Sequence, residues 1–235
     1  MIINMLHIFL QIADIWNTFI GSTLEIVFKG MLIGILASAP MGPVGILIIN
    51  RTMQKGRRYG LATGAGAALS DFFYALMTGM GMSFMLYFIT DEDILFILKL
   101  VGSAMLMIFG IWMFRSDPSK GFRPSHNKKK GTLFHNFITG FFLTISNPLI
   151  IFLFTAVYAL LTFVIPNHWY EMTVGYLSII GGAMLWWLGL TWLVNRLKAN
   201  ITIRGMKTMN HIIGGIVITV SVIYAIMTFL HMSIY

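Results

Sequence analysis

The sequence has no cysteine and very little charge. Its 235 residues include 16 lysines and arginines and 8 acidic residues, so that 10% of the chain is charged and 57% is hydrophobic. The lack of cysteine excludes disulfides, thiolate metal sites and cysteine nucleophiles. A typical soluble domain is roughly 25% charged, so this composition excludes a soluble enzyme, a nucleic-acid-binding protein and a disordered scaffold. We therefore expect an integral membrane protein.

Six windows of the sequence are long and apolar enough to cross a bilayer, whose hydrocarbon core of about 30 Å needs roughly 20 helical residues. They cover residues 24–50, 61–89, 94–114, 133–165, 172–195 and 210–235. The connections between them are mostly short and polar, which leaves no room for a second domain. We therefore predict an all-α membrane protein in which residues 23–235 form a single six-span domain.

Residues 1–22 are apolar but carry polar side chains at intervals, such as Gln11 and Asp14. We expect this N-terminal extension to be an interfacial helix, with an additional span as the alternative. The first basic residue is Lys29, so the chain lacks the positively charged beginning of a signal peptide.

Basic residues are concentrated on one side of the predicted bundle. Fourteen of the 16 lysines and arginines follow the first, third and fifth windows, in residues 51–58, 115–130 and 196–207. The positive-inside rule places these loops in the cytoplasm. The positive charge is thus an orientation signal, with the lysines at 128–130 near anionic lipid headgroups, and we expect no nucleic-acid partner.

Three windows fall in each half of the chain, so homologous halves would be inverted relative to each other. We predict repeat one over residues 23–115, a loop over 116–131 and repeat two over 132–235, each repeat beginning with a broken helix. Transporters often have this arrangement, with the binding site at mid-membrane where the broken helices meet. The internal match is short, so simple packing kinks are the alternative.

Both predicted breaks contain proline. The first window contains Pro40, Gly42 and Pro43 in one stretch of four residues. Asn147 and Pro148 lie deep in the fourth window. Proline removes a backbone donor and clashes with the carbonyl one turn earlier, and Pro43 suits the first turn of a new half-helix. Irregular backbone at mid-membrane is tolerated only where protein or a water-filled cavity surrounds it, so these five residues are candidate substrate-binding residues.

Asp71 lies in the middle of the otherwise uncharged second window. An ionised carboxylate at that depth costs at least about 2.5–3.5 kcal/mol, so it should face the bundle interior or water. We expect a cation or proton site, and the alternatives are a protonated, hydrogen-bonded carboxyl or a partner for Lys99. Lys99 lies close enough to the membrane surface for its side chain to extend its ammonium group to the interface. The second interpretation is that Lys99 pairs with Asp71 or with a substrate carboxylate.

Small residues precede Asp71 at helical spacing: Gly60, Gly64, Gly66 and Ser70. Such spacing lets helices approach closely, so we interpret these residues as helix-packing positions. The tryptophans at 186, 187 and 192 are interpreted as interfacial-belt and packing groups. The six histidines show no metal-ligand spacing and no nucleophile–base pair is visible, so we expect no metal, no cofactor and no enzymatic activity.

Together these residues resemble the lysine-exporter (LysE/RhtB) translocator family of bacterial amino-acid exporters. The resemblance rests on the break at Pro40–Pro43, the stretch from Gly56 to Asp71, Lys99 with Gly102 and Gly110, and Asn147-Pro148, and it covers nearly the whole chain after residue 22. Two departures fall at the expected site. Met41 is inserted where the family pattern reads Pro-Gly-Pro, and Leu149 replaces a lysine that often follows Asn-Pro.

The resemblance implies efflux of amino acids or related small cations, driven by the membrane potential or a proton gradient. We therefore predict a secondary exporter of small zwitterionic or cationic solutes, multi-pass in the bacterial inner membrane, with its basic loops cytoplasmic. Its expected partners are a small-molecule substrate and lipid, and a homodimer is plausible for so small a bundle. The alternatives are an exporter of inorganic cations and a non-transporting membrane assembly protein.

Overall fold

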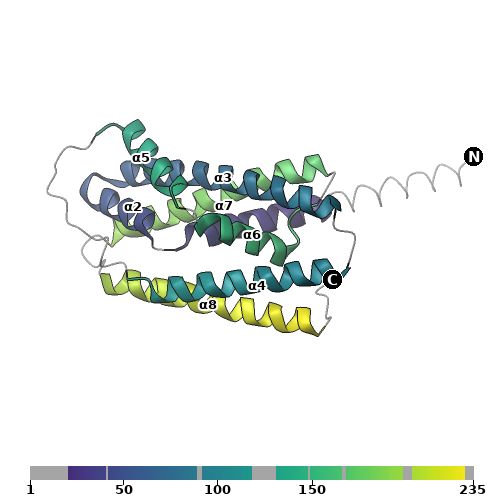
Figure 1. The fold of residues 1–235 in the computed structure, drawn as a ribbon. Coiled ribbons are helices and arrows are strands. Elements are labelled where there is room, and N and C mark those ends of the chain that lie inside the picture. The colour runs from purple at the N-terminus through teal and green to yellow at the C-terminus, as the bar shows by residue number, and fades with distance from the viewer. Residues whose placement is uncertain are drawn as a thin grey trace, which may run out of the picture.

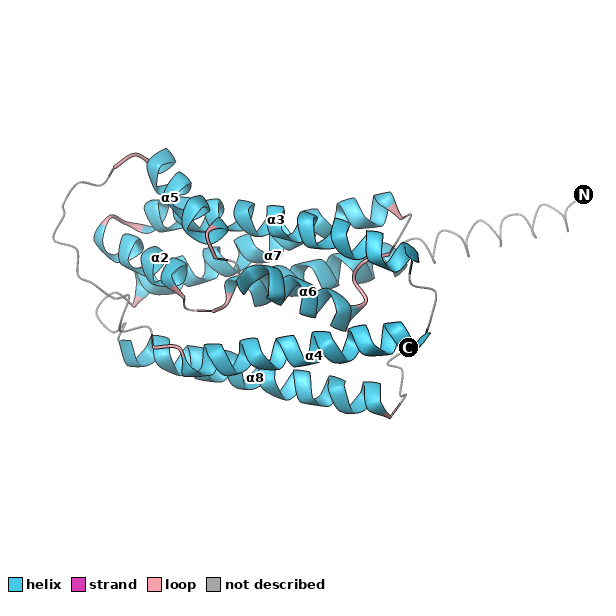
Figure 2. Cartoon of the chain, viewed as in Figure 1, coloured by secondary structure: helices cyan, strands magenta, loops and turns pink. Residues whose placement is uncertain are grey.

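The computed structural model describes residues 21–40, 42–88, 92–117, 131–147, 149–165, 168–197 and 203–230, and all regular structure in these ranges is α-helical (Figure 2). A first helix, Gly21–Ser38, is followed by α2 (Pro43–Gln54), α3 (Arg57–Phe88), α4 (Glu92–Arg115), α5 (Leu133–Ile145), α6 (Leu149–Leu161), α7 (Trp169–Arg196) and α8 (Ile203–Phe229). The all-α prediction is confirmed for this part of the chain. The expected interfacial helix over residues 1–22 lies almost wholly outside the described residues.

Among the described residues, four helices are long and apolar enough to cross a membrane. They are the first helix (Gly21–Ser38), most of α4 (Phe96–Arg115), the whole of α7 (Trp169–Arg196) and most of α8 (Arg204–Phe229). The pair α5 and α6, bent by 71°, provides a fifth candidate if it forms one broken span. The protein is therefore a multi-pass membrane protein. The 12-residue α2 is too short to span alone, since it extends about 18 Å.

Local sequence explains where the shorter helices begin and end. Pro43 occupies the first turn of α2, and Gly56, with a φ of 111°, follows its last residues. A positive φ is available to glycine without the clash that a Cβ would cause, so the chain turns there into α3. At the start of α5, the Thr132 hydroxyl accepts a hydrogen bond from the backbone N–H of His135 at 3.1 Å.

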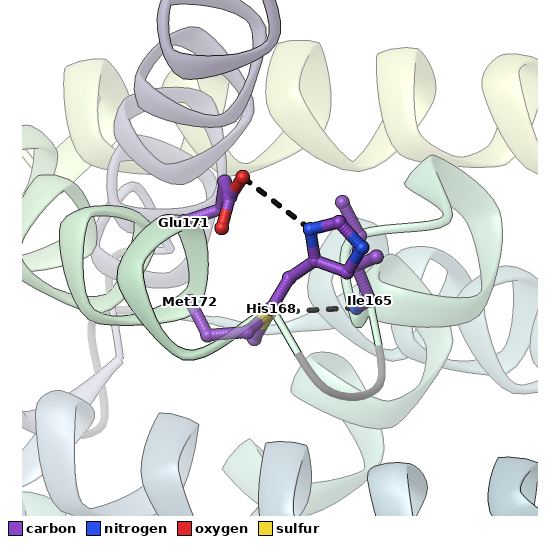
Figure 3. A network of polar contacts seen from close by, with 4 residues as sticks. All are labelled: Ile165, His168, Glu171 and Met172. Atoms are coloured by element: carbon purple, nitrogen blue, oxygen red, sulfur yellow. Dashed lines mark hydrogen bonds and ion pairs between the residues drawn. The ribbon is translucent and has the colours of Figure 1, made fainter. Parts of the chain in front are cut away.

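The connection from α6 to α7 is held by two contacts (Figure 3). His168 Nδ1 lies 3.3 Å from a carboxylate oxygen of Glu171, in the first turn of α7. The backbone N–H of Ile165 donates to the sulfur of Met172 at 3.4 Å. A carboxylate in the first turn of a helix is also favoured by the helix dipole, so these residues define the beginning of α7.

Helix α3 lies at the centre of the packing and contacts α2, α5, α6 and α7. Helices α4 and α8 run side by side as a pair, and α4 joins this pair to the rest of the bundle through α6 (Figure 1). Two buried apolar clusters hold the bundle together. One surrounds Phe154, Tyr158 and Phe163, and the other joins Ile48 of α2 to Trp187 of α7.

Glycine permits two especially close helix crossings. The first helix crosses α7, where a Cβ on Gly34 would overlap the carbonyl oxygen of Ile179 and one on Gly182 would overlap that of Met31. Helix α3 crosses α5, where a Cβ on Gly66 or Gly140 would overlap a backbone carbonyl of the facing helix. Backbone-to-backbone contact of this kind is typical of membrane helices, whose association depends on close van der Waals packing.

Candidate functional site

A cavity of about 60 Å³ lies between the first helix, both helix interruptions, and α3, α4 and α7. A water molecule needs roughly 10–15 Å³ measured in this way, so several waters or one small solute fit. Five of the six candidate binding residues line it: Pro40, Gly42, Pro43, Asp71 and Asn147. The sixth, Pro148, lies outside the described residues, as does Met41.

The first interruption brings the beginning of α2 to the cavity. The backbone N–H of Ala39 donates to Ile35 O at 2.8 Å as the first helix ends, and Gly42 has an extended backbone with φ −78° and ψ −167°. Gly42, Pro43 and Val44 all line the cavity, and no side chain caps α2. The first N–H groups of a helix lack intrahelical acceptors and carry its positive dipole end, so this end of α2 suits an anionic group.

The second interruption is stabilised by hydrogen bonds that replace those lost at Pro148. Without a proline N–H, the carbonyl of Thr144 instead accepts from Asn147 N at 2.9 Å. The carbonyl of Ile145 accepts from the Tyr74 hydroxyl of α3. The Asn147 carbonyl in turn accepts from Ile150 N at 3.3 Å, which begins α6. The break is therefore an organised part of the fold, tied to α3 one turn after Asp71.

Asp71 is 3% exposed and lines the cavity from the middle of α3. The hydroxyl of Ser38, at the end of the first helix, donates to its Oδ2 at 3.3 Å. Within the described residues, no basic side chain comes within ion-pairing distance of this carboxylate; the ion pairs there are Glu25–Lys29 and His168–Glu171. Lys99 has an exposed side chain and is not among the residues that line the cavity.

The small residues of α3 contact three different helices. A Cβ on Gly60 would overlap the Thr52 hydroxyl of α2, one on Gly66 would meet the backbone of α5, and one on Gly64 would lie 2.7 Å from Cγ of Trp187 in α7. Ser70 is completely buried. Gly60, Gly64 and Gly66 thus lie where α3 approaches its neighbours.

Sequence reasoning missed two residues. Arg51 is 8% exposed, and its Nη1 donates to Thr63 Oγ1 at 2.9 Å and to the Asn136 carbonyl at 3.0 Å, so it connects α2, α3 and α5. It lies within α2, which ends at Gln54. Trp187 lines the cavity and is 2% exposed, so its indole is buried inside the bundle rather than exposed as a belt residue would be. Neither contact has a signal in the sequence.

The helices, with a cavity between interrupted segments, define a multi-pass membrane protein. Residues 35–228 match the family described as LysE type translocator, and the chain belongs to this family.

Two curated proteins are similar to this chain. One is the "Putative amino acid efflux protein YcgF" of Bacillus subtilis (strain 168), 29% identical over 142 residues, which are 57% of this chain and 63% of that protein. The other is the "Uncharacterized membrane protein YahN" of Escherichia coli (strain K12), 23% identical over 141 residues, which are 60% of this chain and 61% of that protein. The matched region is thus less than two thirds of each relative. No solved structure matches this chain.

Proposed function

We propose that this protein is a secondary active exporter of amino acids or related small zwitterionic or cationic solutes. The observation that carries the proposal is the cavity, where two interrupted helices and the buried carboxylate of Asp71 meet in a chain of a translocator family. Acids buried within a membrane are costly, and those that proteins keep there mark substrate or ion pathways and proton relays. The name of the Bacillus relative supports amino acids as the cargo.

The proposed architecture is six spans in two inverted repeats, residues 23–115 and 132–235, joined by the loop 116–131. The packing supports it. At each glycine crossing, the helix that begins one half packs against the second predicted span of the other half. Gly34 of the first helix lies on α7, and Gly140 of α5 lies on α3. Corresponding helices also contact each other in the pairs α3–α7 and α4–α8. This exchange of partners is what a twofold axis in the membrane plane would produce.

We place the protein in the bacterial inner membrane with its basic loops in the cytoplasm. The turn between α2 and α3, the start of α5 and the start of α8 lie at one end of the bundle (Figure 1). Exposed Arg57 and Arg58 lie at the start of α3, and exposed Arg204 lies at the start of α8. Burial and the nearby charge of Arg51 lower the pKa of Lys55 in the same turn. Clustered positive charge at one end is retained on the cytoplasmic side.

In the proposed mechanism, the amine of the solute, or a proton, is held at Asp71, where the Ser38 hydroxyl orients Oδ2. The carboxylate of the solute lies at the uncapped beginning of α2, near Pro43. The helices joined at the glycine crossings then move as rigid bodies and open the cavity to alternate sides. The homodimer remains a separate expectation on which this mechanism does not depend.

The test is counterflow in proteoliposomes that contain only this protein, with radiolabelled amino acids outside and unlabelled ones inside. Asp71→Asn should abolish counterflow, whereas Glu171→Gln, which removes a carboxylate outside the cavity, should retain it. Full activity of Asp71→Asn would overturn the role of Asp71. Efflux of metal salts without amino-acid counterflow would favour an inorganic-cation exporter, and no flux of any solute would favour the assembly protein.

A further inference from the structure

The carboxylate of Asp71 lies at the carbonyl end of a helix. The first helix ends at Ser38, whose hydroxyl donates to Asp71 Oδ2, and Ala37 and Ser38 line the cavity together with Asp71. The last carbonyls of a helix have no intrahelical donors and carry the negative end of its dipole, which attracts cations. Asp71 thus adds a negative charge to a helix end that is already negative, so this part of the cavity favours a cation.

Two prolines leave backbone carbonyls near this helix end without their helical donors. Proline has no N–H, so Pro40 cannot donate to the carbonyl of Leu36. For the same reason, Pro43 cannot donate to the carbonyl of Ala39. In transporters with interrupted helices, unwound backbone carbonyls and the carbonyl ends of half-helices coordinate the coupling cation. The end of the first helix therefore adds neutral oxygen ligands to the carboxylate and the hydroxyl.

The spacing of the two side-chain oxygens fits a cation of the size of Na⁺. Ser38 Oγ and Asp71 Oδ2 are 3.3 Å apart, whereas an O–H···O hydrogen bond is usually about 2.7–2.8 Å long. Ca²⁺, which has nearly the same radius as Na⁺, binds oxygen at about 2.4 Å, so two ligands at right angles lie about 3.4 Å apart. A hydroxyl accepts as well as donates, so Ser38 can turn a lone pair toward an ion. The single charge of Asp71 balances a monovalent ion, which favours Na⁺ over Ca²⁺.

We propose that Asp71 and Ser38, with carbonyl oxygens at the end of the first helix, form a Na⁺ site, and that Na⁺ and the ammonium group of the solute occupy it in turn. The inference rests on the proposed function. One carboxylate neutralises only one of the two cations, so they exclude each other. Export of one solute molecule is then coupled to the entry of one Na⁺, and an inward Na⁺ gradient drives efflux.

The first experiment measures binding of radioactive Na⁺ to the purified wild-type protein in detergent. The protein should bind Na⁺, and unlabelled Na⁺ should displace the label at lower concentrations than K⁺, which is larger and fits the oxygen spacing less well. A mixture of the standard L-amino acids should also displace it, because the ammonium group takes the same carboxylate. Equal displacement by K⁺, or Na⁺ binding that the amino acids leave unchanged, would overturn the inference.

Variants of Ser38 test whether its hydroxyl is a ligand. Partners in the outer shell of a metal ion typically contribute about 10–100-fold to its affinity, and a direct ligand should contribute no less. Ser38→Ala should therefore raise the dissociation constant of Na⁺ at least about tenfold, and Ser38→Thr, which keeps a hydroxyl, should restore most of the affinity. Ser103→Ala is the matched control, since Ser103 is equally buried but is not among the residues that line the cavity. Unchanged Na⁺ affinity in Ser38→Ala, or an equal loss in Ser103→Ala, would refute the site; should these variants fail to fold, the wild-type displacement decides.

The second experiment measures efflux of labelled amino acids from proteoliposomes at equal pH on both sides. External Na⁺ should accelerate efflux, and external choline should not. Efflux that needs a pH gradient and proceeds without bound Na⁺ would refute the Na⁺ site and leave the proposed function intact. Na⁺ binding that depends on Ser38, without flux of any amino acid, would instead refute the proposed function and the exchange while supporting the site.

Discussion

Replacing Arg51 by methionine tests whether a single buried guanidinium connects the two halves of the chain. Methionine retains an apolar stem of similar length but loses the hydrogen bonds to Thr63 and to the Asn136 carbonyl. Hydrogen bonds to charged groups contribute about 1.5–3 kcal/mol each, which gives about 3–6 kcal/mol for the pair as an upper bound.

The net loss should be smaller for two reasons. Thr63 keeps the hydrogen bond that its hydroxyl donates to Tyr59 O at 2.9 Å, so it is not left unpaired. Removing a buried charge also recovers part of its desolvation cost. We therefore expect a loss of about 2 kcal/mol, which corresponds to a decrease in Tm of about 4–8 °C for a domain of this size.

The assay is thermal unfolding of the purified protein in detergent, followed by near-ultraviolet circular dichroism. Arg58→Met is the matched control, since Arg58 belongs to the same basic turn but has an exposed side chain. Its Tm should remain within about 1 °C of wild type, as is usual for surface substitutions. Equal decreases for both variants, or an increase for Arg51→Met, would refute the reasoning.

Three further predictions concern packing, the second helix interruption and topology. Gly66→Ala should lower the free energy of unfolding by about 1–3 kcal/mol in the same assay because its Cβ would overlap the backbone of α5. Gly181→Ala should leave stability unchanged, since a Cβ there has no neighbour within 4 Å, and equal losses for the two variants would contradict the close crossing. Tyr74→Phe should lower stability by about 0.5–1.5 kcal/mol by removing the hydrogen bond to Ile145 O, and an unchanged Tm would show that this bond contributes nothing. Because the chain has no native cysteine, Arg58→Cys should react with an impermeant maleimide only from the cytoplasmic side and His168→Cys only from outside, and the reverse pattern would disprove the proposed orientation.

Several features could be predicted from the sequence because they depend on local chemistry. Proline and glycine at Pro40–Pro43, and proline after Asn147, interrupt helices whatever surrounds them, and the structure has interruptions at both places. Because a carboxylate is costly to expose to lipid, Asp71 was expected to face the bundle interior or water. It is buried inside the bundle, where the Ser38 hydroxyl donates a hydrogen bond to it.

Arg51 and Trp187 could not be identified because their roles depend on contacts between distant segments. Arg51 appeared as one of four basic residues in a loop, and only the packing of α5 against α3 brings the Asn136 carbonyl to it. Trp187 follows a similar tryptophan, and the sequence cannot show which of two adjacent indoles faces a cavity. The side chain of Lys99, by contrast, is exposed.

The glycine crossings described above pack the first helix of the chain against α7 and α5 against α3, so each joins the two halves of the chain. The first helix of each half packs against the other half. A fragment that ends after α4 would therefore lack α7, the helix that Gly34 contacts. Both linked pairs meet at the chamber that holds Asp71. Any tilt of one pair against the other would therefore change the shape of this cavity. Under the proposed mechanism, a substitution that stiffens either crossing should slow transport although it changes no residue that contacts the solute.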